Sequence, residues 1–286
     1  MPIAASESLI HVSIQAETLF TIGPLHFTNS MVGALLASAI LLVASWWFLR
    51  RAAMVPNRFQ TAFELPIEWL AGIVAGSTSR WRSYVALVIG LFLMILIANW
   101  LGLLPGVGTI GLVRESGGGK ELVPFVRPAS ADLNFTLGLA IITFVVFVWW
   151  GVRLHGPLGY LKELAGEPRY MAPLMFPIHL ISELSRLVSL SMRLFGNVFA
   201  GEVLLATMLA LTTAVLFVLP LAFFIPAIFL GLELLFGFVQ ALVFALLTMA
   251  YITLAIAEQQ GGHAESDQGD HAPSGAAQDA SAPAHS

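Results

Sequence analysis

The feature that most constrains this chain is a series of apolar runs long enough to cross a lipid bilayer. About 20 helical residues, each rising 1.5 Å, cross the ~30 Å hydrocarbon layer. Four regions qualify, at residues 31–49, 84–104, 135–150 (133–152 with its flanking residues) and 173–257. Of all residues, 58% are hydrophobic and 10% are charged, whereas a soluble domain carries about a quarter charged residues. The sequence therefore predicts an all-α, polytopic membrane protein.

The last apolar region is too long for two straight crossings and too short for four. Pro220 and Pro226 stand near its middle and predict a break there, because proline interrupts a helix. We therefore expect a hairpin of two helices, each longer than about 30 residues and hence longer than about 45 Å. Such helices must lie strongly tilted or extend beyond the hydrocarbon. The whole chain is expected to have about five membrane-embedded helices.

The rest of the chain divides around these runs. Residues 1–30 are expected to form an outer-side segment, since they lack the basic start of a cleaved signal, and residues 31–257 the membrane domain. Residues 59–78 predict an interfacial amphipathic helix, because apolar residues recur there at helical spacing. Residues 258–286 are polar and without periodicity, which predicts a disordered cytoplasmic tail.

Basic residues predict the orientation, since cytoplasmic loops carry an excess of them. One side holds Arg50, Arg51, Arg58, Arg80, Arg82, Arg153, Lys162 and Arg169. The other side holds Arg114, Lys120 and Arg127, and the N-terminal segment holds none. With five crossings, we expect the N-terminus outside and the C-terminus in the cytoplasm.

Several classes of function are disfavoured by composition. The net charge of −4 argues against a nucleic-acid partner, which would require clustered Lys and Arg. The absence of cysteine excludes disulfides and Cys-ligated zinc. An intramembrane enzyme is disfavoured because no His-Glu-x-x-His occurs and the glycine-rich stretch at residues 116–120 fails the phosphate-loop pattern. That stretch is expected to be a flexible outer loop, and no cofactor or metal is expected.

Charged residues inside the hairpin region are the candidates for function. An ionisable side chain at membrane depth costs at least a few kcal/mol and usually marks an ion or proton route. The region contains Glu183, Arg186, Arg193, Glu202 and Glu233. We expect Arg186 to reach the cytoplasmic surface beside Glu183. Arg193 is separated from any other basic residue by almost two helical turns, and it is the leading candidate.

Helical geometry predicts which of these residues face each other. In an antiparallel hairpin, facing residues are equidistant from the turn. Glu202 with Glu233, and Arg193 with Gln240, both centre near position 217, close to Pro220. The sequence therefore predicts a carboxylate pair in the outer half of the hairpin, and a cation beside an amide nearer its middle.

The chemistry of these groups suggests different roles. Two close carboxyls in a low dielectric cannot both ionise easily, so they can share a proton and act as a relay. Arginine stays protonated, so Arg193 would be a fixed charge that attracts a passing carboxylate and bars direct proton passage. The alternatives are that Glu202 and Glu233 face water at a helix end, and that Asn197 is a helix–helix hydrogen-bonding residue instead of part of the route.

The same residues carry a resemblance to a known family. The segment Ser189-Leu-Ser-Met-Arg193-Leu-Phe-Gly-Asn197-Val-Phe-Ala-Gly-Glu202 is similar to the signature helix of subunit a of the bacterial F-type ATP synthase. The resemblance extends to Asn99-Trp-Leu-Gly-Leu-Leu-Pro105 and to Pro128-Ala-Ser-Ala-Asp132-Leu-Asn134, and it covers about residues 12–258.

The resemblance implies a non-catalytic stator subunit in the bacterial inner membrane. Its partners would be the ring of c subunits, the subunit b stalk, the F1 sector through the complex, and lipid. Two half-channels would carry protons to and from a ring carboxylate. Arg193 matches the essential arginine, Glu202 and Gln240 match residues of the outer half-channel and the arginine's surroundings, and Asn197 matches the signature asparagine. Glu233 stands where some members have histidine. A secondary ion-coupled transporter is the main alternative, although no internal repeat of the kind common in transporters is found.

Overall fold

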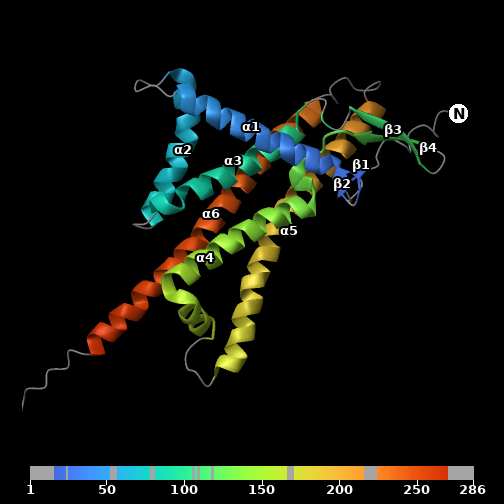
Figure 1. Cartoon of the computed structure of the whole chain (residues 1–286). Coiled ribbons are helices and arrows are strands. Elements are labelled where there is room, and N and C mark those ends of the chain that lie inside the picture. The colour runs from blue at the N-terminus through green and yellow to red at the C-terminus, as the bar shows by residue number, and fades with distance from the viewer. Residues whose placement is uncertain are drawn as a thin grey trace, which may run out of the picture.

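The computed structural model describes residues 16–23, 25–51, 57–77, 81–104, 107, 110–116, 119–165, 171–215 and 224–269. Within these residues the chain forms six α-helices and two short β hairpins (Figure 1). The helices are α1 (Asn29–Arg51), α2 (Arg58–Ser77), α3 (Val85–Gly102), α4 (Leu133–Ala165), α5 (Ala172–Val215) and α6 (Phe224–Gly269).

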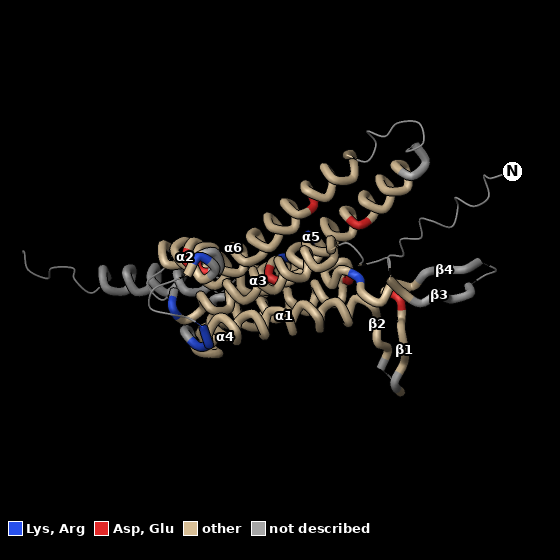
Figure 2. The backbone as a smooth tube through the Cα atoms, turned by 90° about the horizontal axis from the view of Figure 1, so that it is seen from above, with Lys and Arg blue, Asp and Glu red and all other residues tan. Residues whose placement is uncertain are grey.

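Five of the described helices are long and apolar enough to cross a membrane. They are α1, α3, the first part of α4 up to Arg153, α5 and α6. This confirms the predicted class and number of helices. Charged positions are sparse along them, as Figure 2 shows, with acidic positions inside α5 and α6.

The predicted long hairpin is present. Helix α5 has 44 residues and α6 has 46, so both exceed the length of a straight crossing. Pro226 is the third residue of α6, where a missing N–H is tolerated because the first helical turn lacks intrahelical acceptors. The turn itself, including Pro220, lies outside the described residues.

Two helix ends differ from expectation. Helix α4 continues to Ala165 through a bend at Gly156, whose φ of 72° and ψ of 162° are followed by Pro157. Helix α6 continues to Gly269, so the first part of the tail predicted to be disordered is helical. A helix already begun in the membrane adds each further residue at low cost, since only nucleation is unfavourable. Residues 270–286 lie outside the described residues.

The interior of the bundle is built around α3. Its side chains Leu91, Phe92 and Ile95 are buried with Leu194 of α5 and Phe244 of α6. Helix α3 packs on α6, and α4 packs on both α5 and α6. Many large apolar side chains on the other faces remain exposed, as expected for surfaces solvated by lipid.

Helix α2 covers one end of this interior. Leu70 and Val74 are fully buried, whereas Leu65 and Trp69 on the opposite face are exposed. The helix contacts α3. The helix covers most of residues 59–78, and the amphipathic, interfacial character expected for them stays a prediction.

Both β hairpins lie at the end of the helical body where α1 begins (Figure 1). They pair β1 (Thr18–Ile22) with β2 (Leu25–Thr28) and β3 (Gly111–Ser116) with β4 (Gly119–Pro124), each antiparallel. Residues 116, 119 and 120 belong to these strands. The prediction of a flexible loop at residues 116–120 is therefore wrong for the residues that the structure describes. The register aligns Arg114 with Glu121 and Glu115 with Lys120.

Candidate functional site

Arg193 lies at an exposed position of α5. Leu190, Ser191 and Leu194 are buried, and the hydroxyl of Ser191 lies 3.2 Å from that of Thr136 on α4. Arg193 is exposed, because two residues advance a helix by about 200°. It forms no hydrogen bond or ion pair with any residue that the structure describes. The cation is thus available to a group outside this chain.

Asn197 links the two long helices. Its side-chain amide donates a 2.8 Å hydrogen bond to Oε1 of Gln240 on α6, and Gln240 is buried. The predicted neighbour of Gln240 is Arg193, one helical turn before Asn197, and that placement stays a prediction. The hydrogen bond to Gln240 matches the helix–helix alternative for Asn197.

Glu233 packs against the backbone of α5. A Cβ added at Gly201 would lie 2.5 Å from Oε1 of Glu233, so the absence of a side chain at Gly201 makes room for the carboxylate. Oε2 of Glu233 is buried and has no hydrogen-bond partner among the described residues. The predicted depth match between residues near 202 and Glu233 is therefore present.

Glu202 itself has a different partner from the one predicted. Nε of Arg127 donates to Oε1 and Oε2 of Glu202 at 3.1 and 3.2 Å, and Nη2 donates to Oε2 at 2.9 Å. The side chains are 5% and 26% exposed. Glu202 is therefore bound to a cation, and its predicted pairing with Glu233 stays a prediction. Sequence reasoning missed Arg127, although its predicted place on the outer side, just before the third span, was a usable signal.

Three buried polar atoms without partners follow one face of α6. They are Oε2 of Glu233, Oδ1 of Asn99 and Nε2 of Gln240. Asn99, at the end of α3, donates to the carbonyl of Gly237 at 3.1 Å, so the atoms are held near positions 233, 237 and 240. Residues at this spacing share a helix face. Buried polar groups of this kind are ordinarily hydrogen-bonded to ordered water.

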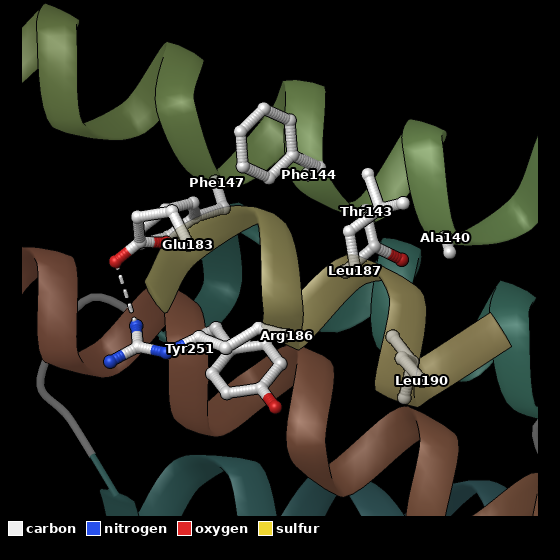
Figure 3. Close-up of a pocket in the computed structure, with 9 residues that line it drawn as sticks. All are labelled: Ala140, Thr143, Phe144, Phe147, Glu183, Arg186, Leu187, Leu190 and Tyr251. Carbon is white, nitrogen blue, oxygen red and sulfur yellow. Dashed lines mark hydrogen bonds and ion pairs between the residues drawn. The ribbon is translucent and has the colours of Figure 1, made fainter. Parts of the chain in front are cut away.

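A second polar cluster lies further toward the start of α5 (Figure 3). Nη1 of Arg186 is 2.9 Å from Oε1 of Glu183, and its guanidinium lies 5.5 Å from the ring centre of Tyr251. These groups line a small cavity of about 20 Å³ between α4, α5 and α6, together with Thr143. Arg186 is thus paired with Glu183, in contrast to Arg193. No cluster of His, Asp or Glu able to hold a metal ion occurs in the described ranges.

Comparisons with known proteins agree with one another. The family model for the ATP synthase A chain matches residues 31–253. An ATP synthase subunit a from Gluconobacter oxydans is 35% identical over an alignment of 245 residues, and the match covers 82% of this chain and 90% of that protein. Others are from Aliarcobacter butzleri, 33% identical over 80% of this chain and 91% of that protein, and Protochlamydia amoebophila, 31% identical over 81% of this chain and 82% of that protein. The chain therefore belongs to the ATP synthase A chain family.

Proposed function

We propose that this chain is the proton-conducting stator subunit of an F-type ATP synthase, a non-catalytic membrane component. The observation that carries the proposal is that Arg193 is exposed on an apolar helix and has no partner among the described residues, which would be costly against lipid alone. A carboxylate on a partner in the membrane removes that cost. The ring of c subunits is the partner that supplies it.

The outer half of the route is proposed to run between α5 and α6. It begins near Glu202 and Glu233, continues along Asn99, and reaches the level of Asn197 and Gln240. The support is the row of buried polar atoms without partners on this face of α6. Water bound to such atoms can pass protons between them.

Arg193 is proposed to act as a fixed charge at the inner end of this route. Arginine does not release its proton at any physiological pH, so it cannot pass a proton on. It instead attracts the ionised ring carboxylate and repels a proton that would otherwise cross without rotation. Coulombic attraction of this kind is strong because water is largely excluded at membrane depth.

Family membership favours this function over a secondary ion-coupled transporter, since the relatives are named ATP synthase subunit a. Within the complex, the subunit b stalk and the F1 sector are the further proposed partners. The proposed location is the bacterial inner membrane, with the N-terminus outside and the C-terminus in the cytoplasm. The excess of basic residues in the predicted cytoplasmic loops supports that orientation.

The experiment is ATP-driven proton pumping in inverted membrane vesicles that carry the complete complex. Arg193→Ala and Glu233→Gln are each expected to reduce pumping by at least about 10²-fold, the usual scale for removing a proton-transfer group or its electrostatic partner. Arg186→Gln, on the same helix, is the matched control and should retain most of the pumping.

Assembly is measured on the same vesicles by co-purification of the c ring and the ATPase subunits with this chain. Wild-type vesicles in which the chain purifies without a c ring would contradict the proposal. Full pumping by an assembled Arg193→Ala complex would contradict the role given to the arginine.

A further inference from the structure

The ion pair between Arg127 and Glu202 separates the roles of the two outer glutamates. Arg127 reaches Glu202 with three hydrogen bonds from two nitrogens, and its own side chain is only 5% exposed. This arrangement is close to the two-pronged geometry in which arginine binds carboxylate most strongly. It joins the segment that precedes α4 to the middle of α5, across 75 positions of sequence.

The backbone of Arg127 is held by close packing from two other helices. A Cβ added at Gly33 of α1 would collide with the carbonyl oxygen of Arg127. A Cβ at Gly102, at the end of α3, would collide with the ring of Pro128. Both glycines therefore permit an approach that a side chain would prevent. The guanidinium is consequently anchored at one place opposite α5.

A buried guanidinium needs a permanent counter-charge. Arg127 keeps its proton, and removing the partner of a buried charge costs about 3–5 kcal/mol. Protonating Glu202 during transport would remove that partner on every cycle. Glu233 differs, because one of its carboxylate oxygens is buried without any partner among the described residues and no cation is bound to it there.

We propose that Arg127 is a positioning residue that holds Glu202 as a static, ionised counter-charge, and that Glu233 alone carries the proton in the outer half of the route. This inference rests on the proposed function. In the proton step, Glu233 accepts a proton from water on the outer side, forming a neutral carboxyl, and passes it to the water chain toward Gln240. Glu202 keeps its charge and its bonds to Arg127 throughout.

The test is a set of paired substitutions in the complete complex. Passive proton flux is measured in F1-stripped vesicles under an imposed membrane potential, and assembly is measured by rebinding of F1. Glu202→Gln and Arg127→Gln are each expected to reduce the flux about tenfold or more, because each removes one charge of the ion pair and leaves the other without its counter-charge. The double variant Arg127→Gln with Glu202→Gln removes both charges and is expected to recover most of the flux.

The control double variant is Arg127→Gln with Glu233→Gln, which also removes one charge of each sign. It should stay as inactive as Glu233→Gln. If Glu202 carries the proton, the first double variant stays as inactive as Glu202→Gln alone although it is assembled, and the proposal is overturned. Wild-type vesicles without proton flux would instead refute the proposed function, so the two failures are distinguishable.

A second measurement applies if the paired variants fail to assemble. An apolar carbodiimide reacts with protonated carboxyls and not with carboxylates, and the modified residue is found by mass spectrometry of the wild-type chain. The proposal expects Glu202 to remain unmodified at the pH where the complex pumps. Modification of Glu202 under those conditions would overturn it.

Discussion

At the scale of single residues, Glu202 and Glu233 show how the surroundings of a glutamate determine the role that it can play. Both lie in the half of the hairpin nearest its turn, yet the carboxylate of Glu202 accepts three hydrogen bonds from Arg127. Glu233 has a glycine backbone against one oxygen and no partner at the other. A carboxylate bound by a guanidinium is fixed in place, whereas one with a free oxygen can bond to water. Chemically identical groups therefore suit different tasks.

Gly201→Ala should disturb this site without removing any charge. The new methyl group would meet Oε1 of Glu233 at 2.5 Å, so the carboxylate must move away from α5. We expect ATP-driven pumping to fall at least about tenfold while the complex still assembles, since misplacing a transfer group by about 1 Å is costly. Pumping in inverted vesicles measures this.

The matched control is Gly90→Ala on α3, where an added Cβ meets nothing within 4 Å. It should pump at close to the wild-type rate, because alanine favours a helix over glycine. Equal pumping by the two alanine variants would show that the position of Glu233 against α5 is unimportant.

At this scale the sequence predicts charge but not pairing. Arg193 is identifiable because a lone cation in an apolar run has no local explanation. The Arg127–Glu202 pair depends on how the segment before α4 folds back over α5, and no periodicity within one helix carries that information.

At the scale of elements, the hairpin of α5 and α6 is held by few polar bonds. The Asn197–Gln240 bond joins the helices directly. The end of α3 adds two more contacts, from Asn99 to the carbonyl of Gly237 and from Trp100 to that of Leu234. Helix contacts in membranes rely on such bonds and on close packing, since lipid is as apolar as the side chains it replaces.

Gly156→Ala should destabilise the bend of α4. The φ of 72° and ψ of 162° at Gly156 lie in a region that is essentially restricted to glycine, and a residue with a Cβ pays about 1–3 kcal/mol there. Denaturant unfolding of the detergent-purified chain measures the loss. Gly138→Ala, on the same helix with nothing within 4 Å of the added Cβ, should not be destabilising. A loss of stability at residue 138 equal to that at 156 would refute the explanation.

The sequence predicts the membrane helices but not the β3–β4 hairpin or the ends of α4 and α6, and the reason is physical. Helices in lipid satisfy their own backbone hydrogen bonds, so the length of an apolar run nearly determines them. The β3–β4 hairpin instead depends on pairing between two short polar strands, for which local hydropathy gives no signal. The bend in α4 and the helical continuation of α6 likewise follow from backbone geometry and cooperativity.

At the scale of the whole molecule, the two β hairpins lie together at one end of the helical body, while α6 ends at the other (Figure 1). The predicted outer segments are thereby gathered on one side. The residues of the proposed outer route occupy the half of the α5–α6 hairpin nearest its turn. The architecture therefore agrees with a route that opens on the side of the β hairpins.

The orientation can be tested by labelling, because the chain contains no cysteine and so gives no background. His26→Cys, at an exposed position of β2, should react with a membrane-impermeant maleimide in spheroplasts. Leu158→Cys, 73% exposed after the bend of α4, should react only in inverted vesicles. The reverse pattern would place the N-terminus in the cytoplasm and overturn the orientation drawn from the basic residues.

Arg193 is proposed to prevent protons from crossing without rotation, while Glu233 is proposed to carry the proton. Passive proton flux through F1-stripped vesicles tests these roles most directly, with rebinding of F1 as the measure of assembly. Removing the fixed positive charge should allow protons to leak through without rotation. Arg193→Ala is therefore expected to conduct protons under an imposed potential although it cannot pump. Glu233→Gln should block both processes. An assembled Arg193→Ala complex that is as tight to protons as Glu233→Gln would contradict the account.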